Sequence, residues 1–257
     1  MNLIEQLKDL LRPLYRNLLA TAHSGSECRC NLCGKSFSGM RPLMGRRADG
    51  STFIITGKVG SCWKCNSYPR VRALWHWLEN DFRIQEKLPL QLLHIAPEAQ
   101  LSDKFLHMQG LEYTAVDKFC EGYKYAKFVK HADILDLPFQ DSTFDMVICN
   151  HVLEHVKDDA RAMSELYRVL KPGGTAVLMV PINNDLEVTA EEKPDEELSG
   201  EEREKRFGQY DHVRLYGRDY YNRLQHTGFQ VERKMLSPQI VKELALEPKE
   251  ELIIASK

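Results

Sequence analysis

The 257-residue sequence has no run of about 18 apolar residues, which is the length that a helix needs to cross a bilayer. The first 23 residues place Glu5, Lys8, Asp9 and Arg12 inside an otherwise apolar stretch, which argues against a secretory signal. The sequence also has no internal repeat, and its net charge is only -2. These absences predict a cytoplasmic protein with no membrane span.

Without a secretory signal, the seven cysteines favour metal ligation or free thiols over disulfides. Four of them form two C-x-x-C pairs, which we predict to bind a structural Zn²⁺, because four thiolates meet the tetrahedral preference of zinc and leave no open position for water. The spacer of 28 residues between the pairs exceeds the roughly 15 to 20 of the common pattern and contains a hairpin-like segment. Cys28 is an alternative ligand in place of Cys30. The predicted ligands are Cys30, Cys33, Cys62 and Cys65.

Charge is spread unevenly along the chain. Residues 1–78 contain twelve Lys and Arg against four Asp and Glu, a net charge of +8, and the remainder carries -10. A basic N-terminal part of the chain indicates an anionic binding partner. The alternative is that the two halves of the chain attract each other.

Two stretches before residue 89 have helical periodicity. Residues 1–23 carry leucines at helical spacing and predict an amphipathic helix that packs on the body of the protein, with a membrane-surface helix as the alternative. Residues 69–88 predict a linker helix, with Arg70 and Arg72 on a solvated face. Between them, residues 24–68 hold the two C-x-x-C pairs.

The stretch from Phe144 to Pro181 predicts a strand, a helix and a second strand. Residues 146–149 form a short apolar run suited to a buried strand. Asp158 and Asp159 favour a helix start, and K-P-G-G at residues 171–174 ends that helix. Residues 175–180 are again apolar. Such a unit indicates a parallel sheet with a right-handed crossover.

Within this stretch, the pattern F-D-x-V-x-x-x-x-V-L-E-H-V and the later L-K-P-G-G closely resemble class I S-adenosylmethionine-dependent methyltransferases of the type 11 family. The resemblance covers residues 89–257. It implies a doubly wound, Rossmann-like α/β sheet and S-adenosyl-L-methionine as cofactor. Residues 24–68 resemble a zinc ribbon.

The resemblance also implies a set of cofactor contacts. The turn after the first strand reads H-I-A-P-E-A-Q from residue 94 and lacks the glycines usual in the family, so a lost cofactor site is a competing interpretation. An acid at the end of the second strand accepts hydrogen bonds from ribose hydroxyls. Asp133 has an alternative role as a turn residue. The predicted cofactor-binding residues are His94, Ala96, Glu98, Asp117, Asp133, Ile134, Asn150 and His151.

The candidate catalytic residues follow an acidic segment, residues 185–206, which predicts a flap or insertion. The next run, F-G-Q-Y-D-H-V-R, is rich in groups that bind or move protons. We predict His212 as a general base, with Asp211 or Glu154 to orient it, and His151 facing the substrate. The alternative is that Glu154 and His155 cap a helix.

Three functions remain open. The first is methyl transfer to an unidentified small-molecule, lipid or glycan acceptor. The second is methylation of rRNA or tRNA, with the basic zinc module binding the RNA. The third is a degenerate, non-catalytic binding protein that has lost the cofactor, since fold alone does not decide function.

Overall fold

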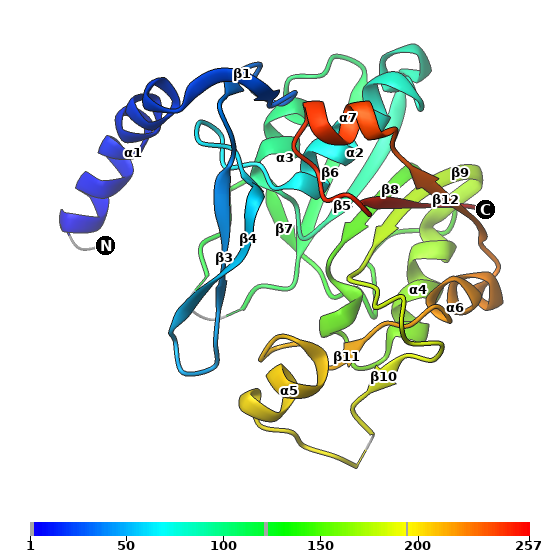
Figure 1. The fold of residues 1–257 in the computed structure, drawn as a ribbon. Helices are drawn as coiled ribbons and strands as arrows, with labels where there is room; N and C mark the ends of the chain where they lie inside the picture. Colours follow the sequence, from blue (N-terminus) through cyan, green and yellow to red (C-terminus); the bar gives the residue numbers. More distant parts are fainter. Residues whose placement is uncertain (1–2, 121–122, 194) are drawn as a thin grey trace. The chain divides into compact units, whose positions relative to one another are not determined.

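The computed structural model describes residues 3–120, 123–193 and 195–257 (Figure 1). Contacts within the chain group it into two units. Unit 1 comprises Met1–Gly45, Thr52–Glu86 and Met235–Glu251, and unit 2 comprises Arg46–Ser51, Lys87–Lys234 and Leu252–Lys257. None of the helices in the described part of the chain is both long enough and apolar enough to span a membrane.

The central feature of unit 2 is a seven-stranded mixed sheet with the order β12-β13-β9-β8-β5-β6-β7. Strands β9, β8, β5, β6 and β7 pair in parallel, and β13 runs antiparallel to β9. This sheet confirms the predicted α/β fold class. The strands are β5 (Leu90–Ile95), β6 (Leu111–Asp117), β7 (Val129–His131), β8 (Phe144–Asn150), β9 (Leu170–Met179), β12 (Gln230–Met235) and β13 (Glu251–Ser256).

The strand order places a topological switch point between β5 and β8. The chain runs from β5 to β6 and β7 on one side, then crosses to β8 on the other side of β5. In open parallel sheets, ligands bind in the crevice outside the carboxyl ends of the strands at such a point. The fold therefore directs attention to the residues that follow Ile95 and Asn150.

Helices cover both faces of this sheet (Figure 1). On one face, alternate strand residues pack with Leu166 of α4 (Asp159–Val169) and Leu224 of α6 (Tyr220–Thr227) in one buried cluster. On the opposite face, the ring of His94 meets Phe105 of α3 (Ala99–Leu106) at 5.9 Å. The start of α4 follows the sequence prediction, since the Asp158 side chain accepts a hydrogen bond from the Arg161 N–H at 2.9 Å.

The acidic segment 185–206 is folded in its described part, which excludes residue 194. It contains β10 (Ala190–Glu191), paired antiparallel with β11 (Arg214–Leu215), and the start of α5 (Gly200–Phe207). Its acids are partly neutralised by ion pairs, with Glu192 to Arg203 at 3.1 Å and Glu196 to Arg206 at 2.8 Å. These ion pairs offset part of the negative charge from which a flap or insertion was predicted in this segment.

Unit 1 consists of short strands and helices. Its elements are α1 (Leu3–Ala22), β1 (Ser24–Arg29), β2 (Ser36–Phe37), β3 (Arg41–Arg46), β4 (Thr52–Ser61), α2 (Pro69–Asn80), η1 (Ile84–Lys87) and α7 (Pro238–Glu243). The helix predicted in residues 1–23 is present over Leu3–Ala22, with Leu10 72% and Leu18 70% exposed, and its packing on the body of the protein stays a prediction. The predicted solvation of Arg72 is wrong, because its side chain is fully buried.

Candidate functional site

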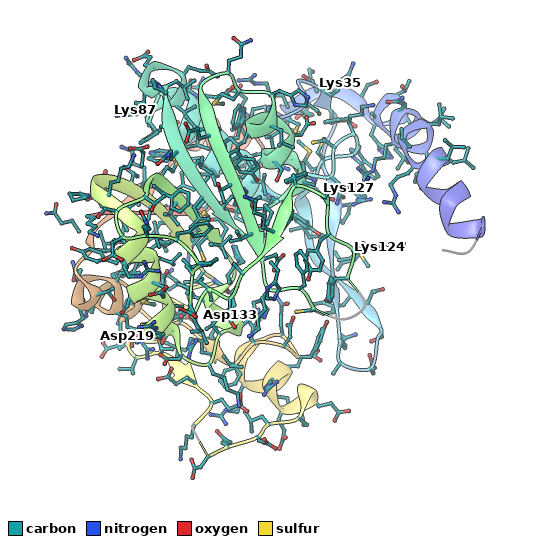
Figure 2. The ribbon with its side chains drawn as sticks, turned by 180° about the vertical axis from the view of Figure 1, so that it is seen from behind. Lys35, Lys87, Lys124, Lys127, Asp133 and Asp219 are labelled. Atoms are coloured by element: carbon teal, nitrogen blue, oxygen red, sulfur yellow. The ribbon has the colours of Figure 1, made fainter. Side chains whose placement is uncertain are left out.

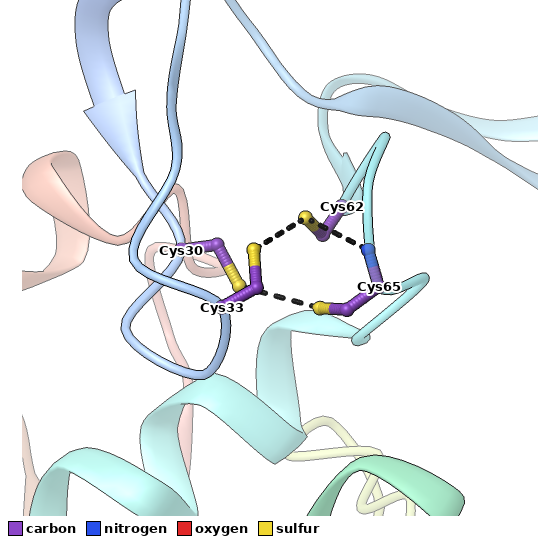
Figure 3. Close-up of side chains that lie close together, drawn as sticks. All are labelled: Cys30, Cys33, Cys62 and Cys65. Carbon is purple, nitrogen blue, oxygen red and sulfur yellow. Dashed lines mark hydrogen bonds between the residues drawn. The ribbon is translucent and has the colours of Figure 1, made fainter. Parts of the chain in front are cut away.

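The four predicted zinc ligands lie together in unit 1 (Figure 3). The sulfur of Cys30 is 3.5 Å from that of Cys65, and the sulfur of Cys33 is 3.6 Å from that of Cys62. These separations approach the edge of a ZnS₄ tetrahedron, about 3.8 Å for a Zn–S bond of about 2.3 Å. The donor set and its spacing therefore fit a structural zinc ion.

The two C-x-x-C turns share one backbone geometry. In the first, the N–H of Gly34 donates to the Cys30 carbonyl at 2.8 Å; in the second, the N–H of Asn66 donates to the Cys62 carbonyl at 2.9 Å. Both closing residues are left-handed, with φ of 73° for Gly34 and 63° for Asn66. Glycine and asparagine are the residues that tolerate this conformation best. The local sequence thus specifies both halves of the site.

The thiols of the cluster perturb one another. Hydrogen bonds from Cys33, Cys62 and Cys65 lower the pKa of Cys30, which favours a thiolate ready for a cation. Cys28 does not join the cluster. Its thiol donates to the carbonyl of Phe37 at 3.7 Å, and burial raises its pKa. The structure therefore favours Cys30 over Cys28 as the ligand.

A buried guanidinium lies beside the second cysteine turn. Arg72 of α2 is fully buried and donates to the Ser67 carbonyl at 2.6 Å and the Gly60 carbonyl at 3.0 Å, on either side of the turn. It also donates to the carbonyls of Leu244 and Ala245, each at 2.7 Å. These hydrogen bonds join three separate segments of unit 1 around the cluster.

In unit 2, the residue directly after β5 and the residue directly after β8 both have a left-handed backbone conformation. Ala96 has a φ of 47° and His151 a φ of 54°. Residues other than glycine adopt this backbone conformation at a cost of roughly 1 kcal/mol or more. Each backbone is held by a neighbouring strand, through Ala96 N–H to the Val116 carbonyl at 2.8 Å and His151 N–H to the Met179 carbonyl at 2.7 Å. Ala96 therefore makes a sharp turn directly after β5.

A hydrogen-bonded network crosses the switch point. Asn150 Nδ2 donates to Glu98 Oε1 at 3.4 Å, and Glu98 Oε2 lies 2.8 Å from His94 Nε2. The other ring nitrogen of His94 is 3.0 Å from the Tyr113 hydroxyl. Because His94 is fully buried with both nitrogens engaged, it orients Glu98. The predicted direct cofactor contact of His94 would require one of these bonds to break.

Three more predicted cofactor residues lie near the same sheet edge. Asp117 ends β6 and is half-buried, and this burial raises its pKa. Asp133 lies on the loop after β7 (Figure 2). There it accepts from the Leu135 N–H at 3.0 Å, a turn contact, and pairs with Lys118 at 2.8 Å. Ile134 is buried. The turn role weighed for Asp133 is thus present, and an adenine contact would share its carboxylate with Lys118.

Beyond β8, a second polar cluster forms from residues far apart in the sequence. Glu154 and His155 belong to η2 (Leu153–His155), and Asp211 and His212 come from the segment before β11. The His155 and His212 rings are 4.8 Å apart and nearly perpendicular, and His155 Nδ1 is 3.6 Å from the Asp211 carboxylate. The Val213 N–H donates to the Glu154 carbonyl at 2.9 Å and ties the two segments together.

Burial and neighbouring charges shape this cluster. Burial alone would raise the pKa of Glu154, but the hydrogen bond from His151 and the charges of His151 and His155 hold it below its usual value. Burial lowers the pKa of His212 despite the nearby Glu154 carboxylate. Glu154 Oε2 and His212 Nδ1 are buried with no hydrogen-bond partner in the described structure. The cluster therefore holds unsatisfied lone pairs in a partly closed site.

Sequence reasoning missed the residue that holds this cluster in place. Arg214 of β11 donates to the Leu153 carbonyl at 2.8 Å, to the Val156 carbonyl and to the Lys157 carbonyl at 2.8 Å. These carbonyls flank Glu154 and His155 in η2. The run D-H-V-R places an arginine two residues after His212, but β11 begins only at Arg214, so strand alternation could not have assigned it this role.

The family model described as a methyltransferase domain matches residues 99–178. Residues 99–178 form a methyltransferase domain. The domain runs from the start of α3 to the end of β9 and contains Asp117, Asn150 and His151. The resemblance found from the sequence is therefore confirmed over residues 99–178, which include β8 on one side of the switch point but not β5 on the other.

Known proteins resemble this methyltransferase domain over short stretches. The chain is 48% identical over 48 residues to a 2-phytyl-1,4-naphtoquinone methyltransferase of Nostoc punctiforme, covering 19% of this chain and 21% of that protein. It is 30% identical over 82 residues to a Mycolicibacterium smegmatis protein named as a probable S-adenosylmethionine-dependent methyltransferase, covering 32% of each. The chain thus spans about a fifth to a third of the length of these relatives.

A solved structure with a similar arrangement is an S-adenosylmethionine-dependent methyltransferase from Mesorhizobium loti. It shares 16% identity, covers 75% of this chain and 100% of its own, and gives a TM-score of 0.47. A score and identity at this level assign no function to this chain.

Proposed function

We propose that the protein is an S-adenosylmethionine-dependent methyltransferase that acts on a small-molecule acceptor. The observation that carries the proposal is the Glu98–Asn150 contact across the switch point, beside the left-handed turn at Ala96. It supports a working cofactor crevice despite the missing glycines. The methyltransferase domain at residues 99–178 supplies the reaction class.

The residues at this edge fit the polar groups of S-adenosyl-L-methionine. Its ammonium group needs acceptors, and the Glu98 carboxylate and the unpartnered Asn150 Oδ1 offer them. Its ribose hydroxyls need an acceptor, which Asp117 offers at the end of β6. Asp133 and Ile134 are proposed to hold the adenine. When bound, the cofactor supplies a methyl group already activated as a sulfonium.

The chain's own residues then position the acceptor and take its proton. We assign proton removal to His212, whose Nδ1 has no partner in the described structure, and its orientation to Asp211. His151 links the two regions, because it follows Asn150 directly and its Nδ1 lies 3.3 Å from Glu154 Oε1. A base contributes only where the acceptor oxygen or nitrogen must lose a proton in the reaction.

The acceptor class rests on relatives rather than on the geometry. The matched naphthoquinone methyltransferase acts, by its name, on a small molecule. An RNA acceptor is the alternative, and it would show binding that weakens steeply as salt rises, because phosphate contacts release counterions. A membrane-embedded acceptor is not required by any residue described above.

Calorimetric titration of the zinc-loaded protein with S-adenosylmethionine and S-adenosylhomocysteine tests the proposal. We expect micromolar binding, about -8 kcal/mol. Asp117→Asn should weaken binding about tenfold or more, because an amide replaces one acceptor oxygen of the carboxylate with a donor. Asp103→Asn, at an exposed position of α3, is the matched control and should bind like the unmodified protein.

Absence of binding to either ligand would refute the proposal and favour a non-catalytic binding protein. Equal affinities for Asp117→Asn and the control would reject the ribose assignment.

A further inference from the structure

The structure contains a second group of potential metal ligands, separate from the four cysteines. One ligating atom from each of Glu154, His155 and His212 lies within 4.8 Å of the other two. In the described part of the chain, only this group and the cysteine cluster bring three or more such atoms together. Two imidazoles and a carboxylate form a donor set used by zinc and other divalent transition metals.

The strongest evidence for a bound ion comes from buried polar atoms that have no hydrogen-bond partner. Glu154 is 1% exposed and His212 is 3% exposed, yet Glu154 Oε2 and His212 Nδ1 have no hydrogen-bond partner in the residues described. Oδ1 of Asp211 is likewise buried and unpartnered. Unsatisfied polar atoms in a protein interior are rare and cost roughly 1 to 3 kcal/mol each. A cation between them would satisfy several lone pairs at once.

The candidate ligands are also oriented by neighbours, as ligands in metal sites are. The second carboxylate oxygen of Glu154 lies 3.3 Å from His151 Nδ1. His155 Nδ1 lies 3.1 Å from the Asp211 carbonyl, so a proton on Nδ1 leaves Nε2 free as a ligand. Arg214 fixes the carbonyls that flank both residues in η2.

The cluster is closed on one side and open on the other. Glu154 and His212 are buried, whereas the side chains of His155 and Asp211 are 35% and 43% exposed. Three protein ligands would leave at least one coordination position available, as in catalytic metal sites. The exposed side gives an exogenous oxygen or nitrogen access to that position.

We propose that Glu154, His155 and His212 bind one divalent transition-metal ion next to the cofactor crevice. Ion binding by these residues stands independently of the proposed methyl transfer. The ion's use rests on the proposed function: it holds the acceptor's oxygen or nitrogen and eases the loss of its proton to solvent, as bound metal ions do for water. Ion binding and the base role proposed above are alternative states of the same imidazole: with the ion bound, the acceptor's proton leaves to solvent, and without it His212 takes the proton.

Cobalt titration of the full-length, zinc-loaded protein tests the site. Cobalt(II) held by nitrogen and oxygen ligands absorbs in the visible range without the near-ultraviolet thiolate band that a cysteine site would give. We expect one additional cobalt per chain without a new thiolate band. Glu154→Gln and His212→Gln should each weaken this binding at least tenfold, because each loses a ligand.

Two further variants keep the test decisive. His155→Gln changes a partly exposed ligand, so weakened binding there cannot come from a collapsed core. His107→Gln changes an exposed histidine of similar chemistry at the end of α3 and should bind cobalt normally. Circular dichroism of each variant checks its fold.

Failure of the wild-type protein to bind extra cobalt at millimolar concentration would overturn the proposal, and so would binding that all three ligand variants retain. Titration of the same samples with S-adenosylmethionine separates this result from the proposed function. Cofactor binding without cobalt binding rejects the metal site alone.

Discussion

Arg72 in unit 1 and Arg214 in unit 2 are both buried, with 0% and 3% of their surfaces exposed, and each donates to the backbone carbonyls of a turn that carries a candidate ligand cluster. Arg72 holds the carbonyls on either side of the second cysteine turn, at Gly60 and Ser67. Arg214 holds three carbonyls around Glu154 and His155. A rigid planar fork with five donors suits this task better than lysine would.

The two arginines differ in how their charge is balanced. Arg214 lies 3.3 Å from the Glu191 carboxylate and 3.6 Å from that of Asp159. The hydrogen bonds described above for Arg72 all go to carbonyls, and the negative charge that stabilises its buried guanidinium comes from the thiols of the cysteine cluster. Burial lowers the pKa of Arg72, and thiolate charge on Cys30, Cys62 and Cys65 offsets that shift. Unit 1 therefore couples its buried cation to its cysteine cluster.

Loss of a zinc ligand should break this coupling and give the largest effect. Structural zinc contributes on the order of 10 kcal/mol in zinc-finger peptides, so we expect Cys33→Ser to lose zinc and unfold unit 1. All three tryptophans, at positions 63, 75 and 77, belong to unit 1, and their fluorescence therefore reports on that unit. Zinc content and tryptophan emission are the measurements.

Cys28→Ser is the matched control, since Cys28 is buried but lies outside the cluster. We expect it to keep its zinc and to cost about 1 kcal/mol of unfolding free energy, as an ordinary buried substitution does. Retention of zinc and native emission by Cys33→Ser would show that the cysteine cluster does not hold unit 1 together.

Removal of the buried cation itself should have the next largest effect. Arg72→Gln leaves four carbonyls short of donors and deprives the thiolates of a nearby positive charge, so we expect a loss of about 3 to 5 kcal/mol. Zinc affinity should fall as well. Urea unfolding followed by tryptophan fluorescence measures the first effect, and competition with a zinc chelator measures the second.

Arg214→Gln is the informative counterpart, because it removes an equally buried arginine from unit 2. It should leave zinc affinity unchanged and weaken cobalt binding at the Glu154 cluster. Equal zinc affinity in Arg72→Gln and Arg214→Gln would argue against the coupling of Arg72 to the cysteine cluster.

The same contrast explains what the sequence could and could not predict. The cysteine ligands follow from local spacing, because each turn closes within five residues and needs only Gly34 or Asn66 at its end. The sheet could be predicted from apolar runs and from the helix signals at Asp158 and K-P-G-G. The burial of Arg72 could not, because its acceptors at residues 244–245 lie 172 and 173 positions away.

The polar cluster of unit 2 was predicted only in part for the same reason. His212 and Asp211 stood out by residue type, but their meeting with Glu154 depends on the Val213 hydrogen bond and on Arg214. The surroundings of His94 could not be predicted either. His94 was predicted as a cofactor contact, which stays a prediction, and the structure places it within β5, buried beneath α3 with both nitrogens engaged.

The smallest predicted effect concerns the acids near each arginine and depends on pH. Glu250 in unit 1 is half-buried, and this burial raises its pKa to about 7 from the usual 4.5, although Arg70 and Arg72 oppose the shift. Glu191 of unit 2 shows the reverse: burial would raise its pKa, but Arg223 and Arg214 hold it below the usual value. The negative charge of Glu250, near the carbonyl-bound Arg72, is thus poorly compensated.

The sign of the effect follows from proton counting. Between pH 4.5 and about 7 the folded protein binds more protons at Glu250 than the unfolded chain does, so the free energy of unfolding falls as pH rises through this window. Above pH 7 the accumulated loss is at most about 3 kcal/mol. Glu250→Gln should therefore be more stable than the unmodified protein by up to about 3 kcal/mol at pH 8, and by less than about 1 kcal/mol at pH 5.

Urea unfolding of unit 1, followed by tryptophan fluorescence at the two pH values, measures this difference, with the exposed Glu27→Gln as control. A stability gain that is the same at pH 5 and pH 8 would mean that Glu250 acts through packing rather than charge. A gain confined to pH 8 in Glu250→Gln, and absent from Glu27→Gln, would show that the charged form of Glu250 destabilises unit 1 because Arg70 and Arg72 do not compensate for its burial.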